Sequence, residues 1–226
     1  MSVRQEFDQW ANTGKDRGME ERHWHTAKRA LSRMPVERGD TVLDLGTGSG
    51  YALRALRETQ DAGMSVGLDG SPEMVRNANE YTDDASLSFL SGDFHQLPFE
   101  EDSMNHVWSM EAFYYSQEPL RLLSEIRRVL RSGGTFFCAV NFFEESEHSH
   151  DWQNSISVDM QLWNRKRYRE NFRQSGLYVA EQDTIPDREI EIPSAEEFPT
   201  ENWDTREEMI DRYRTWGTLL TVGVAP

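Results

Sequence analysis

The chain has 226 residues, 37% of them hydrophobic, which is enough for one large α/β domain whose buried core needs no disulfide support. Its formal net charge of −16 disfavours binding to nucleic-acid backbones and to anionic membrane surfaces. The single cysteine, Cys138, excludes an intramolecular disulfide, and no apolar stretch reaches the roughly 20 residues of a membrane span.

These properties predict a soluble cytoplasmic protein, a monomer or a homodimer, with neither nucleic acid nor membrane among its partners. Most basic residues are arginines, and lysine occurs only at Lys15, Lys28 and Lys166. Scarce lysine beside abundant Asp and Glu resembles proteins from salt-loving organisms, where salt screens the repulsion between acidic side chains. Salt adaptation is therefore a hypothesis, and an ordinary acidic cytosolic protein is the alternative.

The region before the first predicted strand contains one predicted helix. Apolar residues recur at three- and four-residue steps from Trp24 onward, which predicts a helix over residues 20–34. The segment before it, which includes Phe7 and Trp10, is predicted to be irregular.

A buried strand is predicted over residues 41–45, and it leads into the glycine turn of residues 46–50 and a helix over 51–59. Glycines at alternate positions let the backbone turn tightly and approach a ligand, toward which the first N–H groups of the helix point. A dinucleotide fold has its third glycine one residue later, where this chain has Tyr51. Asp44 would repel a pyrophosphate but can hold an ammonium group.

The stretch from Asp44 to Gly50 resembles the first motif of the class I S-adenosylmethionine-dependent methyltransferases, an acidic residue followed by x-Gly-x-Gly-x-Gly. The alternative is a plain strand-to-helix turn. The resemblance implies a Rossmann-like, doubly wound α/β sheet of seven strands, mostly parallel with strand seven antiparallel. It also implies S-adenosyl-L-methionine as cofactor, with its methionyl end held by Asp44, Gly46, Thr47, Gly48 and Gly50.

In that family a segment before the first strand folds over the cofactor pocket. The resemblance therefore makes Trp10, Met19, His23 and Trp24 candidates for lining the pocket. The alternative is a helix packed on the edge of the sheet with its histidines at the surface.

A second strand is predicted over residues 64–68 and ends at Asp69 and Gly70, after which Ser71 caps a helix. A carboxylate at the end of a strand beside the first one can accept hydrogen bonds from both hydroxyls of a ribose. The family has its ribose-binding acid at this place. The resemblance thus implies that Asp69 binds the ribose, that Gly70 belongs to the cofactor site and that Met74 contacts the adenine.

A third strand is predicted over residues 86–90, and Asp93 and Phe94 follow it. The resemblance implies that Asp93 accepts from the adenine amino group while Phe94 lies against the ring. Residues 97–103, Leu-Pro-Phe followed by an acidic turn, resemble the small-molecule branch of the family. A dinucleotide enzyme has no use for all of these motifs, so an NAD-type oxidoreductase is the less favoured alternative. A non-catalytic module that binds S-adenosylmethionine is the other.

A fourth strand is predicted over residues 104–109. The family's amino methyltransferases of nucleic acids and proteins carry Asn/Asp-Pro-Pro-Tyr/Phe after it, and this chain does not. The difference favours a small-molecule methyl acceptor. Glu111, Tyr114 and Tyr115 are the polar candidates nearest the transferred methyl, and packing in the core is the alternative for the tyrosines. Glu111, Tyr114 and His23 are the candidate catalytic residues, and Glu111 is also a candidate cofactor contact.

The remainder is predicted to complete one methyltransferase domain. The predicted elements are a helix over 119–131 ended by residues 132–134, a strand over 135–141, a helix over 160–175, a strand over 178–185, a helix over 205–214 and a strand over 218–224. The predicted parts are an N-terminal helical cap over 1–40, a cofactor-binding core over 41–141, and lid-like inserts over 142–158 and 186–215. No metal is predicted, because His148 and His150 lie in a polar loop of the kind that is usually solvated.

Overall fold

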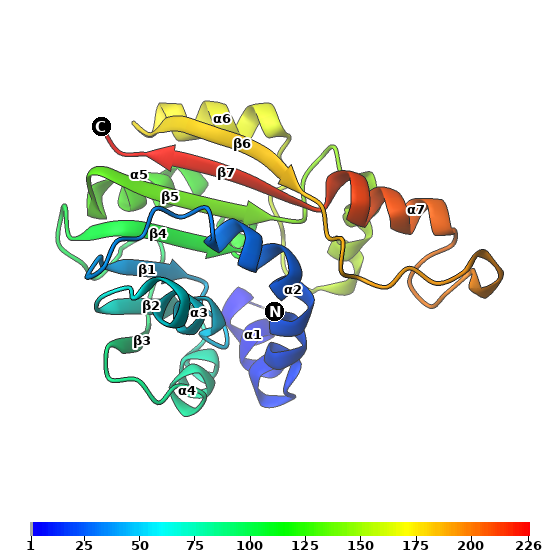
Figure 1. Ribbon diagram of the computed structural model, residues 1–226, viewed down its shortest axis with the longest axis horizontal. Coiled ribbons are helices and arrows are strands. Elements are labelled where there is room, and N and C mark those ends of the chain that lie inside the picture. Colours follow the sequence, from blue (N-terminus) through cyan, green and yellow to red (C-terminus); the bar gives the residue numbers. More distant parts are fainter. Residues whose placement is uncertain (1) are drawn as a thin grey trace.

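The computed structural model describes residues 2–226, which form a seven-stranded sheet with helices on both faces (Figure 1). The strand order is β3-β2-β1-β4-β5-β7-β6, and β7 runs antiparallel to both of its neighbours. The strands are β1 (Val42–Leu45), β2 (Ser65–Asp69), β3 (Leu87–Ser91), β4 (Met104–Met110), β5 (Leu130–Val140), β6 (Tyr178–Ile185) and β7 (Thr218–Val224). The predicted α/β sheet with an antiparallel seventh strand is confirmed.

The helices connect the strands and cover the sheet. They are α1 (Val3–Asn12), α2 (Lys15–Leu31), α3 (Tyr51–Gln60), α4 (Pro72–Glu80), α5 (Pro119–Val129), α6 (Arg165–Gln174) and α7 (Arg206–Ile210). Helix α7 continues as a wider turn over residues 211–216, and residues 147–155 form a 3₁₀ segment after β5. Among residues 2–226, no helix is both long enough and apolar enough to cross a lipid bilayer.

The core lies on both faces of the sheet because successive strand residues point to opposite sides. On β5, Phe136 and Cys138 belong to the hydrophobic cluster that contains α5 and α6. Phe137 and Ala139, which alternate with them, belong to the cluster on the side of α2 and α3. This double coverage explains why the central strands carry apolar residues on both faces.

The N-terminal segment differs from the prediction, because residues 3–12 form helix α1 instead of an irregular lead-in. Ser2 and Gln5 form a capping box that satisfies the first backbone N–H groups. Phe7 and Trp10 share one face of the helix and pack edge to face, with ring centroids 5.2 Å apart. Helix α2 also begins earlier than predicted, at Lys15.

Two other boundaries differ from the prediction. Helix α5 ends at Val129 and the next residue already belongs to β5, so residues 132–134 do not terminate the helix. A register shift between Met104 and His106 of β4 accommodates this longer strand. Helix α6 begins at Arg165 instead of residue 160, because the Asn164 side chain accepts from the N–H of Arg167 and caps the helix there.

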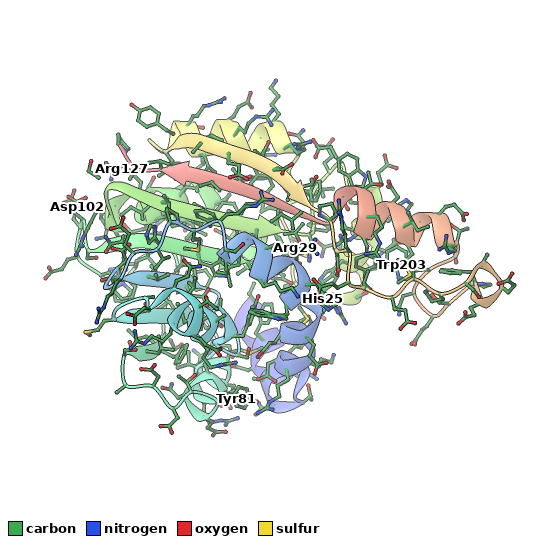
Figure 2. All side chains as sticks on the ribbon, in the orientation of Figure 1. His25, Arg29, Tyr81, Asp102, Arg127 and Trp203 are labelled. Atoms are coloured by element: carbon green, nitrogen blue, oxygen red, sulfur yellow. The ribbon has the colours of Figure 1, made fainter. Side chains whose placement is uncertain are left out.

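The N-terminal cap is held against the segment that follows β6. His25 and Arg29, both on α2, lie beside this segment in Figure 2. The Nδ1 atom of His25 lies 3.2 Å from Oδ2 of Asp187, and Arg29 donates to the carbonyl oxygen of Pro186 at 3.0 Å. The rest of the segment extends away from the sheet to α7 (Figure 1).

Candidate functional site

A cavity of about 670 Å³ lies at the carboxyl ends of the parallel strands β1, β2 and β4. This edge of an open α/β sheet is the usual place for a ligand. The predicted site residues that line it are Asp44, Gly46, Thr47, Gly48, Asp69, Gly70, Met74, Asp93, Phe94, Glu111 and His23. The acids at the carboxyl ends of β1, β2 and β3, Asp44, Asp69 and Asp93, therefore border one space. Gly50 lies behind the cavity wall, where a Cβ would come within 2.7 Å of the Phe89 ring.

The glycine turn leaves room for a ligand. Gly46 and Gly48 have φ angles of +78° and +51°, which side-chain-bearing residues rarely adopt. A Cβ on Gly46 would overlap that of Ala112, so this glycine is needed for packing. A Cβ on Gly48 would meet no atom within 4 Å, so the backbone there faces open space. The cavity wall at Gly48 thus fits a ligand that approaches the main chain closely.

Asp69 joins the glycine turn to helix α4. Its Oδ2 accepts from the N–H of Gly48 at 3.0 Å, and its Oδ1 accepts from the N–H of Ser71 at 2.9 Å. Burial raises the pKa of Asp69 to about 6, although these two hydrogen bonds oppose the shift. The carboxylate is therefore fixed in place at the cavity wall.

Asp44 and Asp93 occupy different environments. Asp44 is 2% exposed, accepts from Oγ1 of Thr47 at 2.8 Å, and has its pKa raised to about 7 by burial. A cation in the cavity would favour its charged form. Asp93 lies near the surface, and its Oδ1 accepts from the N–H of His95 at 2.8 Å, which lowers its pKa. His95 also reaches Ser116 across the cavity wall, with Nε2 2.7 Å from Oγ.

Glu111 follows β4 and is held from two sides. Its Oε2 accepts from the Tyr114 hydroxyl at 3.0 Å, and its Oε1 accepts from the N–H of Asn141. Burial raises the pKa of Glu111 to about 7. Tyr114 is 1% exposed and lines neither cavity, so the hydrogen bond to Glu111 is its contact with the site, whereas Tyr115 lines the first cavity.

Three of the four candidate cap residues line the cavity, namely Trp10, Met19 and His23. Trp24 does not; it packs edge to face on Tyr51, with centroids 6.2 Å apart. His23 is buried, and its Nε2 has no hydrogen-bond partner among residues 2–226. Burial lowers the pKa of His23 to about 3, so the ring is neutral at pH 7.

A second cavity, of about 750 Å³, adjoins the first and shares Trp10, Met19 and Glu111 with it. Phe142 and Trp152 line it from the segment after β5, and Trp203 and Arg212 line it from the segment after β6. Figure 2 shows Trp203 on the extended part of the latter segment. The two inserts predicted to be lid-like therefore border the same space.

The histidines of the first insert have separate partners. The Nε2 atom of His148 lies 3.8 Å from Oδ2 of Asp211, while His150 reaches the backbone carbonyl oxygens of Phe143 and Glu144. Within residues 2–226 there is no group of three or more His, Cys, Asp or Glu side chains placed to hold a metal.

Sequence reasoning missed Asn141, His95 and Arg212. Asn141 directly follows a parallel strand at the ligand-binding edge, so the rule that identified Asp44 and Asp69 could have found it. No comparable signal exists for Arg212, which lies in an acidic segment far along the chain. Its position depends on how that segment folds over the sheet.

A seven-stranded sheet of this topology, with acids at three successive strand ends around one cavity, defines a class I methyltransferase fold. A family model described as a methyltransferase domain matches residues 43–138. A chain of the solved complex between the Haloferax volcanii Trm112 methyltransferase activator and a proposed methyltransferase is 67% identical over 100% of both chains, with a TM-score of 0.98. The protein belongs to the class I S-adenosylmethionine-dependent methyltransferases.

Curated relatives match over shorter stretches. Malonyl-[acyl-carrier protein] O-methyltransferase of a Marinomonas species is 34% identical over 108 residues, which are 47% of this chain and 40% of that protein. Sterol 24-C-methyltransferase of Pneumocystis carinii is 32% identical over 123 residues, which are 51% of this chain and 32% of that protein. The chain thus spans less than half the length of these relatives.

Proposed function

We propose that the protein transfers the methyl group of S-adenosylmethionine to a small-molecule acceptor that binds in the second cavity. The observation that carries this proposal is the junction of the two cavities at Trp10, Met19 and Glu111. The first cavity is lined by carboxylates that suit the cofactor, and the second offers a separate space beside it.

The residues of the first cavity suit each part of the cofactor. Asp44, which is buried and has its pKa raised to about 7, would pair with the ammonium group of the methionyl end. Asp69, already fixed by backbone N–H groups, would accept from the ribose hydroxyls. Asp93 would accept from the adenine amino group, with Phe94 and Met74 against the ring.

The cofactor supplies an activated methyl group on a sulfonium, so the chain mainly has to align the acceptor and exclude water. Glu111 lies at the junction and has a pKa near 7, so it can take a proton from an acceptor that arrives protonated. Tyr114 orients this carboxylate. His23 lines only the first cavity, and its neutral ring is too weak a base to deprotonate the acceptor at pH 7.

The assignment of Asp69 is tested by isothermal titration of Asp69→Ala with S-adenosylhomocysteine. We expect Kd to rise by about 30-fold, because hydrogen bonds to a charged acceptor contribute about 2 kcal/mol. Asp83→Ala is the matched control: it removes the same charge from an exposed position outside both cavities. Circular dichroism checks that both variants are folded. Unchanged binding by folded Asp69→Ala contradicts the assignment.

Two further measurements separate the alternatives. Titration with NADH tests the oxidoreductase, which would bind NADH more tightly than S-adenosylhomocysteine. Incubation with methyl-labelled cofactor and a metabolite extract tests turnover. Label in a small molecule supports the proposal, whereas tight cofactor binding without any transfer favours a non-catalytic binding module.

We also infer that the protein binds a Trm112-type activator. The 67% identical chain of the solved complex matches this protein along its full length. Because this protein contains a methyltransferase domain, that chain is the methyltransferase of the complex and not the Trm112 activator. The prediction of a monomer or homodimer did not include such a partner. Mixing the protein with Haloferax volcanii Trm112 should give one earlier peak in size-exclusion chromatography at high KCl. Separate elution of the two proteins would refute this inference.

A further inference from the structure

The second cavity contains a buried guanidinium without a carboxylate partner. Arg212 is 8% exposed and lines this cavity from the turn that continues α7. Its Nη1 donates to the carbonyl oxygen of Gly217 at 2.7 Å, and its Cζ lies 5.1 Å from the centroid of the Tyr213 ring. Among residues 2–226, these are the partners of its side chain. Nε and Nη2 have none, yet they keep accessible surface.

Burying this guanidinium costs free energy, which the charges of Glu111 and Asp187 offset in part. Burial lowers the pKa of Arg212, because the charged form loses hydration. A guanidinium has five N–H donors, and proteins normally satisfy a buried one with a carboxylate or several carbonyl groups. Arg128 of the same chain shows the usual solution: Glu125 accepts two hydrogen bonds from it at 2.8 Å, and two backbone carbonyls accept others.

The acids around the second cavity are engaged elsewhere or lie at its rim. Asp187 faces His25 and accepts from two backbone N–H groups of its own loop. Glu208 caps α7, and Glu111 accepts from Tyr114 and Asn141. The remaining acids that line the cavity, Asp151, Glu201 and Asp204, belong to exposed positions. The unfilled donors of Arg212 thus have no competing internal acceptor.

Part of the remaining lining is aromatic, and two cationic side chains lie over these rings. Trp10, Phe142 and Trp152 contribute ring faces or edges. Lys15 lies over the Trp10 ring at 5.4 Å, and Arg22 lies over the Trp152 ring at 5.7 Å. A cavity with rings on its wall and open N–H donors at one point suits a ligand that has an apolar body and one anionic end.

We propose that Arg212 anchors an anionic oxygen group, a carboxylate or a phosphate, on the methyl acceptor, whose apolar body lies against Trp10, Phe142 and Trp152. The inference rests on the proposed function, because it takes the second cavity as the acceptor site. The planar guanidinium can form two parallel hydrogen bonds with either group. Acceptor binding would then compensate the buried charge and fix the molecule relative to the junction at Glu111.

The test uses three probes that share a phenyl ring and differ in charge: phenylacetate, phenyl phosphate and 2-phenylethylamine. Each is titrated into the full-length protein saturated with S-adenosylhomocysteine. We expect the wild type to bind an anionic probe more tightly than the amine. The anion that binds more tightly identifies carboxylate or phosphate as the group recognised. R212Q should weaken binding of that anion by about tenfold or more, because it removes the positive charge and the paired N–H donors of the guanidinium.

R188Q is the matched control: it removes an arginine charge at an exposed position of the same segment, outside both cavities, and should bind the anion like the wild type. R212K keeps the charge and should retain the preference for the anion with weaker binding. If R212Q does not fold, the wild-type preference and R212K decide. A preference for the amine, no binding of either anion, or equal anion binding by folded R212Q would overturn the inference.

These outcomes are distinct from failure of the proposed function. If the wild-type protein binds S-adenosylhomocysteine but shows no preference for the anions, only the proposed role of Arg212 is contradicted. If the wild-type protein does not bind S-adenosylhomocysteine at all, the proposed function itself is contradicted.

Discussion

Glu111 combines two costs that a purely structural residue would avoid. It is a non-glycine residue at φ +55°, a conformation disfavoured by contact between Cβ and the backbone, and it is a buried carboxyl group. Tyr114 and Asn141 hold it in this conformation. Strain and burial at one residue that borders both cavities are typical of functional sites.

At the residue scale, Glu111→Gln should change how stability depends on pH. The pKa of Glu111 is raised from 4.5 to about 7 in the folded protein, so the folded state binds the proton more tightly than the unfolded state. Its contribution to stability therefore falls as pH rises from about 4.5 to about 7. A glutamine does not ionise and has no such cost. The free energy of unfolding of the variant, relative to wild type, should therefore increase by about 1–3 kcal/mol from pH 5 to pH 8. Urea unfolding of both proteins at pH 5 and pH 8 measures this change. An equal difference in the free energy of unfolding between variant and wild type at the two pH values would contradict the prediction.

The strand-end acids were predictable because a single rule places them. Asp44, Asp69 and Asp93 each follow an apolar run, and parallel strands bring their carboxyl ends to one edge. Arg212 escaped prediction because the α7 turn approaches the cavity only through tertiary contacts. Trp24 was a candidate for the pocket that the structure places outside its lining, because periodicity identifies a helix and its apolar face, but not which ring on that face reaches a ligand.

At the element scale, helix α1 forms part of the wall of the first cavity. It packs on α4, and its Val3, Phe7 and Trp10 side chains line the first cavity. Such an element opens locally at low free-energy cost until a ligand adds contacts. S-adenosylhomocysteine should therefore slow amide hydrogen exchange in α1 by about tenfold or more, while exchange in β6 stays unchanged. Protection of the glycine turn without protection of α1 would show that the helix does not cover the ligand.

The boundaries that sequence reasoning missed have different causes. For α1, the helical spacing of Val3, Phe7 and Trp10 was present in the sequence, and Ser2 offered a cap. For the start of β5, two glycines predict a helix end, but pairing of Leu130 with Met104 extends the strand past them. Tertiary hydrogen bonding overrides local propensity there, so no reading of the sequence alone would have placed that boundary.

At the scale of the whole molecule, the charge of −16 predicts stabilisation by salt. Repulsion between acidic side chains opposes the compact state, and salt screens it. We expect the melting temperature to rise by about 5–10 °C between dilute buffer and about 2 M KCl, as about 2–3 kcal/mol would produce in a domain of this size. Sucrose at matched osmolality controls for solvent effects unrelated to charge. No gain in KCl beyond that in sucrose would refute salt adaptation.

The position of β7 has a consequence for how the chain is made. Residues 218–224 insert between β5 and β6, so β6 pairs with nothing in the sheet until they arrive. During synthesis, β1 to β5 can assemble as they leave the ribosome, whereas β6 and the segment after it must wait for the final strand. The second cavity, which needs Gly217 and Thr218 in its wall, therefore forms last on the nascent chain.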